Sequence, residues 1–135
     1  MPSPEPIPLS RLPHGEAARL LTFADFDPAS GVVHGRRDGR TREAPLDFFP
    51  DCLLIELMAQ TAGLGLPEGG GAVIASIPRV RLHRAARAEE TIDIEARRGR
   101  RLGSLFTFDC RATTAGELLA EGEIVLRAET VLGEK

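Results

Sequence analysis

The chain has 135 residues, of which 42% are hydrophobic and 27% charged, and its formal net charge at pH 7 is −3. This length and composition predict a single domain over residues 1–135 and exclude wholesale disorder. The acidic balance argues against nucleic acid as a partner, because a domain-wide basic field is missing. The longest apolar stretch, residues 52–66, is interrupted by Glu56, Gln60 and Thr61, so we expect no membrane span.

The two cysteines, Cys52 and Cys110, lie in apolar surroundings without the spacing of metal ligands. The N-terminus lacks the basic start and apolar run of a secretory signal. We therefore expect a reducing, cytoplasmic location, and we predict neither a metal ion nor another cofactor.

The first third of the chain predicts strands. Residues 1–11 are rich in proline and are expected to form an irregular arm. Strands are predicted at residues 17–26 and 32–37, each bounded by glycine or proline. The polar segment 36–48 that follows is ambiguous.

The clearest element is a helix over residues 50–64. Pro50 and Asp51 suit its first turn, and Pro67 follows its end. Its sequence is apolar almost all round, which is typical of a buried helix. Glu56 and Gln60 lie one turn apart on this helix.

The remainder of the chain predicts antiparallel strands. Pro78 marks an edge or a bulge, residues 97–101 are interpreted as a hairpin turn, and Ala115–Gly116 as the next turn. Strand patterns run through residues 72–82, with Pro78 between them, and through residues 91–96, 102–111 and 117–129. Two strands, one long helix and then three or four antiparallel strands predict an α+β fold in which one apolar helix covers one face of an antiparallel sheet.

The helix sequence Pro50-Asp51-Cys52-Leu-Leu-Ile-Glu56-Leu-Met-Ala-Gln60-Thr-Ala-Gly63 resembles the central-helix motif of the 3-hydroxyacyl-acyl-carrier-protein dehydratases. Leu12-Pro13-His14 resembles the Leu-Pro-His of that family, and the resemblance covers about residues 11–127. The chain is also similar to the dehydratase-like proteins of aryl-polyene clusters.

This resemblance implies a hot-dog fold, in which a curved sheet wraps around the central helix, and a dimer whose two sheets join edge to edge. It also implies an acyl thioester substrate, carried by acyl carrier protein or CoA, in fatty-acid or polyene-type biosynthesis.

By the resemblance, Glu56 is the catalytic carboxylate and Gln60 orients it. Burial favours the protonated form of a carboxyl group, which suits acid–base chemistry near neutral pH. The alternative is a structural glutamate satisfied by Gln60 or by backbone donors. We favour the catalytic interpretation, because a buried unpaired glutamate is rare.

The sequence departs from the family at two positions of the site. The second catalytic residue, a histidine, is expected fourteen residues before the glutamate, where this chain has Arg42. We expect Arg42 to lie near Glu56, where it could pair with the carboxylate but could not shuttle a proton. Asp51 replaces the glycine at the helix start, where free N–H groups near Asp51 and Cys52 would polarise the thioester carbonyl.

Other residues have two interpretations. His14 and His34 could supply the missing histidine from a loop or from a neighbouring subunit, although surface positions are commoner. Cys52, in the first helical turn, could be a nucleophile but is interpreted as a small core residue. The arginines are either solvated or form a docking surface for an acidic carrier protein or a phosphate group; they are Arg79, Arg81, Arg84, Arg87, Arg97, Arg98, Arg100 and Arg101.

Three functions remain open at this point. The first is dehydration of a 3-hydroxyacyl thioester to the trans-2-enoyl thioester. The second is a catalytically silent hot-dog subunit that pairs with an active paralogue. The third is an acyl thioesterase, which needs a carboxylate and a water molecule but not the missing histidine.

Overall fold

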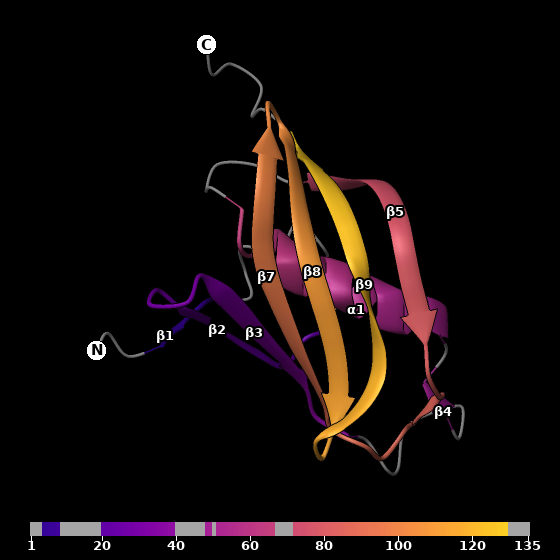
Figure 1. Cartoon of the computed structure of the whole chain (residues 1–135). Helices are drawn as coiled ribbons and strands as arrows, with labels where there is room; N and C mark the ends of the chain where they lie inside the picture. Colours follow the sequence, from indigo (N-terminus) through magenta and orange to yellow (C-terminus); the bar gives the residue numbers. More distant parts are fainter. Residues whose placement is uncertain (1–3, 9–19, 40–47, 50, 67–71, 130–135) are drawn as a thin grey trace.

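The computed structural model describes residues 4–8, 20–39, 48–49, 51–66 and 72–129, with only the backbone described at 48–49. In these residues, seven strands form one antiparallel sheet in the order β1-β2-β3-β7-β8-β9-β5, and the helix α1 lies against it (Figure 1). The elements are β1 Glu5–Pro6, β2 Phe23–Asp27, β3 Val32–Arg37, β4 Phe48–Phe49, α1 Asp51–Gly63, β5 Ala72–Leu82, β6 Ala86–Arg87, β7 Ile92–Leu102, β8 Leu105–Thr114 and β9 Glu117–Ala128. The predicted order of strands around one helix is confirmed.

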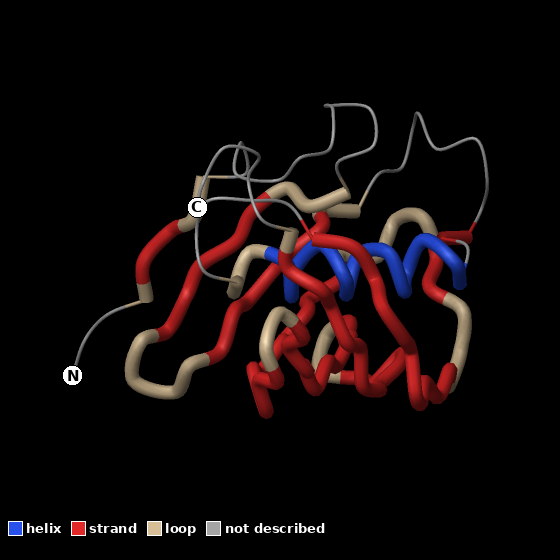
Figure 2. Tube along the Cα trace, turned by 90° about the horizontal axis from the view of Figure 1, so that it is seen from above, coloured by secondary structure: helices blue, strands red, loops and turns tan. Residues whose placement is uncertain are grey.

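The helix α1 is buried against the sheet over most of its length. Figure 2, seen from above, shows it running along one side of the strands. Its buried residues are Leu54, Leu57, Met58, Ala59, Gln60, Thr61 and Ala62. The close approach depends on Gly35 of β3, because a Cβ atom there would lie 2.5 Å from the Thr61 Oγ1 atom.

The first turn of α1 is an exception to the predicted burial. Asp51, Cys52 and Leu53 are exposed, and Leu53 retains 37% of its accessible surface. The prediction that Cys52 is a core residue is therefore wrong. It was based on the apolar neighbours of Cys52 in the sequence, but the first turn lies outside the part of the helix that the sheet covers.

The helix-facing side of the sheet follows the predicted alternation. The buried strand residues include Val33, Ile92, Ile94, Ala96, Phe106, Phe108, Cys110, Ala112, Ile124 and Leu126. The β8–β9 turn falls at Ala115 and Gly116, as predicted, and both have positive φ angles of 49° and 83°. A mirror-image turn of this kind matches the twist of the two strands that it joins.

The predicted turn at residues 97–101 is wrong, because β7 continues through this segment to Leu102. Arg97, Arg98 and Arg101 of this segment are paired with residues of β8. The Arg101 guanidinium also lies 4.9 Å from the Phe106 ring centroid. The chain reverses instead around Gly103, whose φ of 62° favours glycine.

At the edges of the sheet, one prediction is wrong and one is confirmed. Residues 1–11 were expected to be irregular, but Glu5–Pro6 pairs with β2. The prediction that Pro78 marks an edge or a bulge is confirmed, because it lies in the edge strand β5, whose register with β9 shifts twice between Ile74 and Arg79. Proline lacks an N–H donor, which fits its place in an irregular edge strand. Of the strand predicted at 17–26, residues 17–19 lie outside the described residues, and residues 20–22 are not part of the strand, which begins at Phe23.

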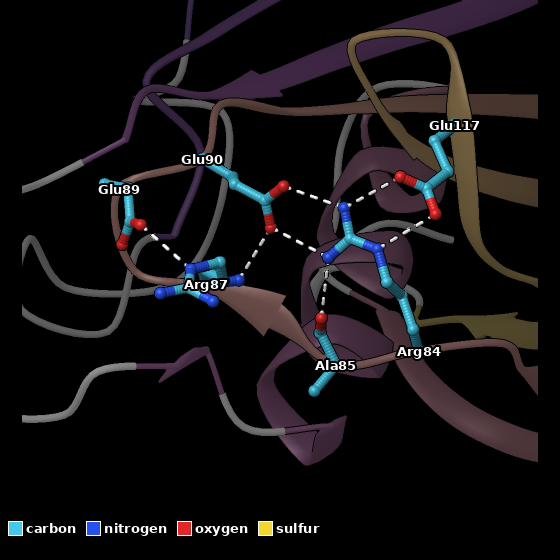
Figure 3. Close-up of polar contacts among 6 residues, drawn as sticks. All are labelled: Arg84, Ala85, Arg87, Glu89, Glu90 and Glu117. Carbon is cyan, nitrogen blue, oxygen red and sulfur yellow. Dashed lines mark hydrogen bonds and ion pairs between the residues drawn. The ribbon is translucent and has the colours of Figure 1, made fainter.

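A charged cluster fixes the loop that follows β5 (Figure 3). The Arg84 guanidinium donates to both carboxylate oxygens of Glu90 at 3.0 and 2.8 Å, to both of Glu117 at 3.1 and 3.0 Å, and to the Ala85 carbonyl at 2.9 Å. These contacts use all five N–H donors of the arginine. They fasten the loop to Glu117 at the start of β9. The loop leads directly into β6, which pairs with β4, the short strand that precedes the helix.

Candidate active site

The central feature of the candidate site is a carboxylate and an amide on α1. Glu56 is half-buried, whereas Gln60 is buried with 2% of its surface exposed. The Gln60 Nε2 atom donates to the Glu56 Oε2 atom at 3.3 Å. The i, i+4 spacing places both side chains on one face of the helix. Glu56 is thus less covered than the apolar sequence predicts.

The other end of the Gln60 amide binds the chain before β2. The Leu20 N–H group donates to Gln60 Oε1 at 2.9 Å, across 40 residues of sequence. The Leu20 carbonyl in turn accepts a hydrogen bond from Arg37 Nη1 at 3.0 Å. Sequence reasoning missed Leu20 and Arg37, because no local pattern signals contacts over such separations.

The start of α1 is open to solvent. Asp51 occupies its first turn, and Asp51 and Cys52 are both exposed. The first N–H groups of a helix have no partners within the helix, so an accessible first turn can donate to an anionic or carbonyl oxygen. The Asp51 carboxylate lies in the same turn and competes for that position.

His34, one of the two histidines considered as partners, does not lie beside Glu56. Val33 and Gly35 of β3 face the helix, so His34 between them points to the opposite face. There it lies 3.4 Å from Asp25 and 3.7 Å from Glu95. The interpretation of His34 as a surface histidine is therefore confirmed, and within one chain it does not reach Glu56. The predictions for Arg42 and His14 lie outside the described residues.

His83 is also engaged elsewhere. Its Nε2 atom lies 3.0 Å from the Glu121 Oε2 atom, at the end of β5. A hollow of about 510 Å³ lies next to this pair, over β5, β8 and β9. Its lining residues are Arg79, Arg81, Asp109, Cys110, Arg111, Glu121 and Gly122, so it does not include Glu56 or Gln60.

The two cysteines have different surroundings. Burial, with a smaller contribution from the nearby Asp109 charge, raises the pKa of the Cys110 thiol to about 12. Such a thiol is inert near neutral pH, whereas Cys52 is accessible. Within the described ranges, no group of three or more His, Cys, Asp or Glu residues is placed to hold a metal ion. The described residues also contain no helix that is long and apolar enough to span a membrane.

Comparisons with known proteins agree with this fold. No family model matches the chain. It is 34% identical over 82 residues to the 3-hydroxyacyl-[acyl-carrier-protein] dehydratase FabZ of Agrobacterium fabrum, a match that covers 57% of this chain and 53% of FabZ. The match thus spans about half the length of this curated relative.

Solved structures cover more of the chain. The dehydratase heterocomplex ApeI:P of Xenorhabdus doucetiae matches with a TM-score of 0.77 and 20% identity, over 92% of both chains. The thioesterase HI1161 of Haemophilus influenzae matches with a TM-score of 0.66 and 14% identity, over 87% of this chain and 85% of the thioesterase.

The chain has the hot-dog fold, with one helix covered by a curved antiparallel sheet. The similarity to FabZ, together with the match to the ApeI:P structure, supports the resemblance to the hot-dog dehydratases.

Proposed function

We propose that this protein acts on 3-hydroxyacyl thioesters and removes water to give trans-2-enoyl thioesters. The observation that carries the proposal is the Glu56–Gln60 pair on the central helix. It lies within a hot-dog fold, in a chain similar to a dehydratase. The substrate carrier is acyl carrier protein or CoA, and no cofactor is required. The cytoplasmic location stays a prediction.

In this proposal Glu56 is the acid–base residue. Dehydration breaks the C2–H and C3–O bonds, forms the C2–C3 double bond and releases the hydroxyl group as water. Glu56 works on the C2 proton or on the departing hydroxyl, and Gln60 holds its carboxyl group in place. The N–H groups at the exposed start of α1 polarise the thioester carbonyl and stabilise the charge that develops on its oxygen.

A product assay tests the proposal and separates it from thioester hydrolysis. A 3-hydroxyacyl carrier protein and the matching CoA thioester are incubated with the purified protein. We expect the enoyl thioester as product. A free 3-hydroxy acid would instead indicate a thioesterase, a function favoured by the structural match to HI1161. If neither product forms, the result contradicts catalysis by this chain alone.

A second candidate is a catalytically silent subunit paired with an active paralogue. It is favoured by the absence of a histidine beside Glu56 among the described residues, and by the structural match to a dehydratase heterocomplex. On this proposal Glu56 and Gln60 persist because replacing one would break the hydrogen bond between them. Purification from the native host tests it: a stable complex with a histidine-bearing dehydratase supports it, and an active homodimer contradicts it.

The edge strand β5 supports a dimer, either of this chain or with a paralogue. Among the described residues β5 pairs only with β9, and most of its side chains are exposed, including Val73, Ile74 and Ile77 at 36–41%. Long apolar edges are normally covered. Light scattering should give the mass of a dimer for the wild type and a lower mass for Ile77→Arg. Leu102→Arg, at a more exposed site away from β5, is the control and should keep the dimer mass.

The end of β7 is proposed as the contact for an acidic carrier protein. Arg84 and Arg87 are already paired with carboxylates, whereas Arg98 and Arg101 are exposed beside Phe106. Arg98→Glu with Arg101→Glu should raise KM for the carrier-protein substrate and leave KM for the CoA substrate unchanged. Equal effects on both substrates would contradict this contact.

A further inference from the structure

The orientation of the Gln60 amide follows from its partners. A backbone N–H group can only donate, so the Gln60 atom that faces Leu20 N must be the carbonyl oxygen Oε1. The NH₂ group is then directed at Glu56. The position of the Leu20 backbone therefore decides which atom Gln60 presents to the carboxylate.

The Leu20 backbone is held on both sides. Gln60 accepts from its N–H, and Arg37, the last residue of β3, donates to its carbonyl at 3.0 Å. Next to it, Thr22 N–H donates to the Arg36 carbonyl at 2.8 Å. Residues 20–22 are thus fastened to the end of β3, and the contact at Leu20 is made by the Arg37 side chain. A hydrogen bond from a charged donor is stronger than one between neutral groups.

We infer that Arg37 is a positioning residue for Glu56, acting through the Leu20 backbone and the Gln60 amide. The inference rests on the proposed acid–base role of Glu56. With Arg37 in place, Leu20 stays at the Oε1 atom and the NH₂ group stays on the carboxylate. Without it, the Leu20 carbonyl loses this charged donor, and residues 20–22 are held by the Thr22–Arg36 backbone hydrogen bond and by Gln60. Leu20 can then shift from the Oε1 atom, and the amide can turn away from Glu56.

The adjacent arginine provides a matched control. Arg36 precedes Arg37 on β3, but its guanidinium lies over the Phe23 ring at 5.0 Å from the centroid and donates to Asp38 at 3.1 Å. Both arginines are at the end of the same strand, but the Arg36 guanidinium contacts Phe23 and Asp38 rather than Leu20 or Gln60. Replacing each with methionine removes the guanidinium and keeps a long apolar side chain.

Kinetics provide the first readout. Loss of one well-made hydrogen bond is worth on the order of a tenfold rate change. We expect Arg37→Met to lower kcat about tenfold with KM unchanged, as for an interaction that acts on the chemical step. Arg37→Lys, which can still donate to the Leu20 carbonyl, should stay within about threefold of the wild type. Arg36→Met should match the wild type.

Nuclear magnetic resonance provides a second readout that does not depend on activity. In Arg37→Met the Leu20 amide should exchange faster with solvent and the Gln60 side-chain NH₂ signals should shift, whereas Arg36→Met should leave both unchanged. This result would support the inference even if the wild type proved inactive, an outcome that would contradict only the proposed function. Unchanged Leu20 exchange and Gln60 signals in Arg37→Met would overturn the inference, whatever the kinetics.

Discussion

Replacing Glu90 with glutamine should destabilise the protein near neutral pH, because Glu90 lies at the centre of the Arg84 cluster (Figure 3). Its carboxylate accepts two hydrogen bonds from Arg84, at 3.0 and 2.8 Å, and one from the Arg87 N–H at 2.8 Å. These contacts, Arg84 first, lower the pKa of Glu90 from its ordinary 4.5 to about 2. The charged form is therefore the one that the fold stabilises.

The structure bounds the size of this effect. A pKa change from 4.5 to about 2, at about 1.4 kcal/mol per pKa unit, gives an upper limit of about 3.5 kcal/mol. Solvent screens part of it, because the side chains of Glu90 and Arg84 are 21% and 33% exposed. We expect Glu90→Gln to reduce the free energy of unfolding by about 1–2 kcal/mol at pH 7.

The effect must also depend on pH in a defined direction. Because the pKa of Glu90 is lower in the folded state than in the unfolded state, its contribution is complete above about pH 5. It is lost as the pH falls from there towards 2. Urea unfolding of the two proteins should therefore give a difference in unfolding free energy that is constant from pH 7 to 5 and shrinks below pH 4.5.

A neighbouring glutamate is the control for this measurement. Glu89 lies in the same loop and pairs with Arg87, but the two side chains are 47% and 69% exposed. Glu89→Gln should therefore cost much less than Glu90→Gln at pH 7, because solvent screens an exposed ion pair. Equal costs for both substitutions, or a Glu90→Gln difference that does not change with pH, would refute the assignment of the stability to the Arg84–Glu90 contacts.

Three further predictions concern the helix, the cysteines and the departures from the dehydratase motif. Gly35→Ala should lower the free energy of unfolding by about 1–3 kcal/mol in urea denaturation, because its Cβ would collide with the helix; unchanged stability would contradict the close packing. A thiol reagent should label Cys52 and spare Cys110 in the folded protein, as mass spectrometry would show, and equal labelling would contradict the difference in burial. Arg42→His combined with Asp51→Gly should raise the rate of enoyl-thioester formation above the wild type, and an unchanged rate would contradict the motif alignment.

The sequence predicted those features of the fold that depend on local pattern. The alternation at Ile92, Ile94 and Ala96 identified a strand and its buried face, and the apolar run around Leu57 and Met58 identified the central helix. Both patterns report burial directly, since apolar residues recur at the period of the element that contains them.

The wrong predictions share a different cause. The segment 97–101 is charged and contains a glycine, as a turn would, but cross-strand pairing and the stacking of Arg101 on Phe106 keep it extended. Cys52 has apolar neighbours in the sequence, yet it lies in a turn of the helix that the sheet does not cover. In each case tertiary position overrides local composition.

The candidate site was predictable only in part. The i, i+4 spacing of Glu56 and Gln60 indicated their contact, because it lies within one helix. The contacts of Leu20 with Gln60 and of Arg37 with Leu20 cross 40 and 17 residues. Such contacts depend on how β2, β3 and the helix meet, which no local pattern encodes.

The most direct test of the account is the rate of enoyl-thioester formation by the wild type and by Glu56→Gln, with a 3-hydroxyacyl carrier protein as substrate. Glu129→Gln, at an exposed position beyond β9, is the matched control. The account predicts that Glu56→Gln lowers the rate by a factor of about 10²–10⁴, the usual worth of an acid–base group, and that Glu129→Gln leaves it unchanged. Equal rates for the wild type and Glu56→Gln would remove Glu56 from the chemistry and contradict the account.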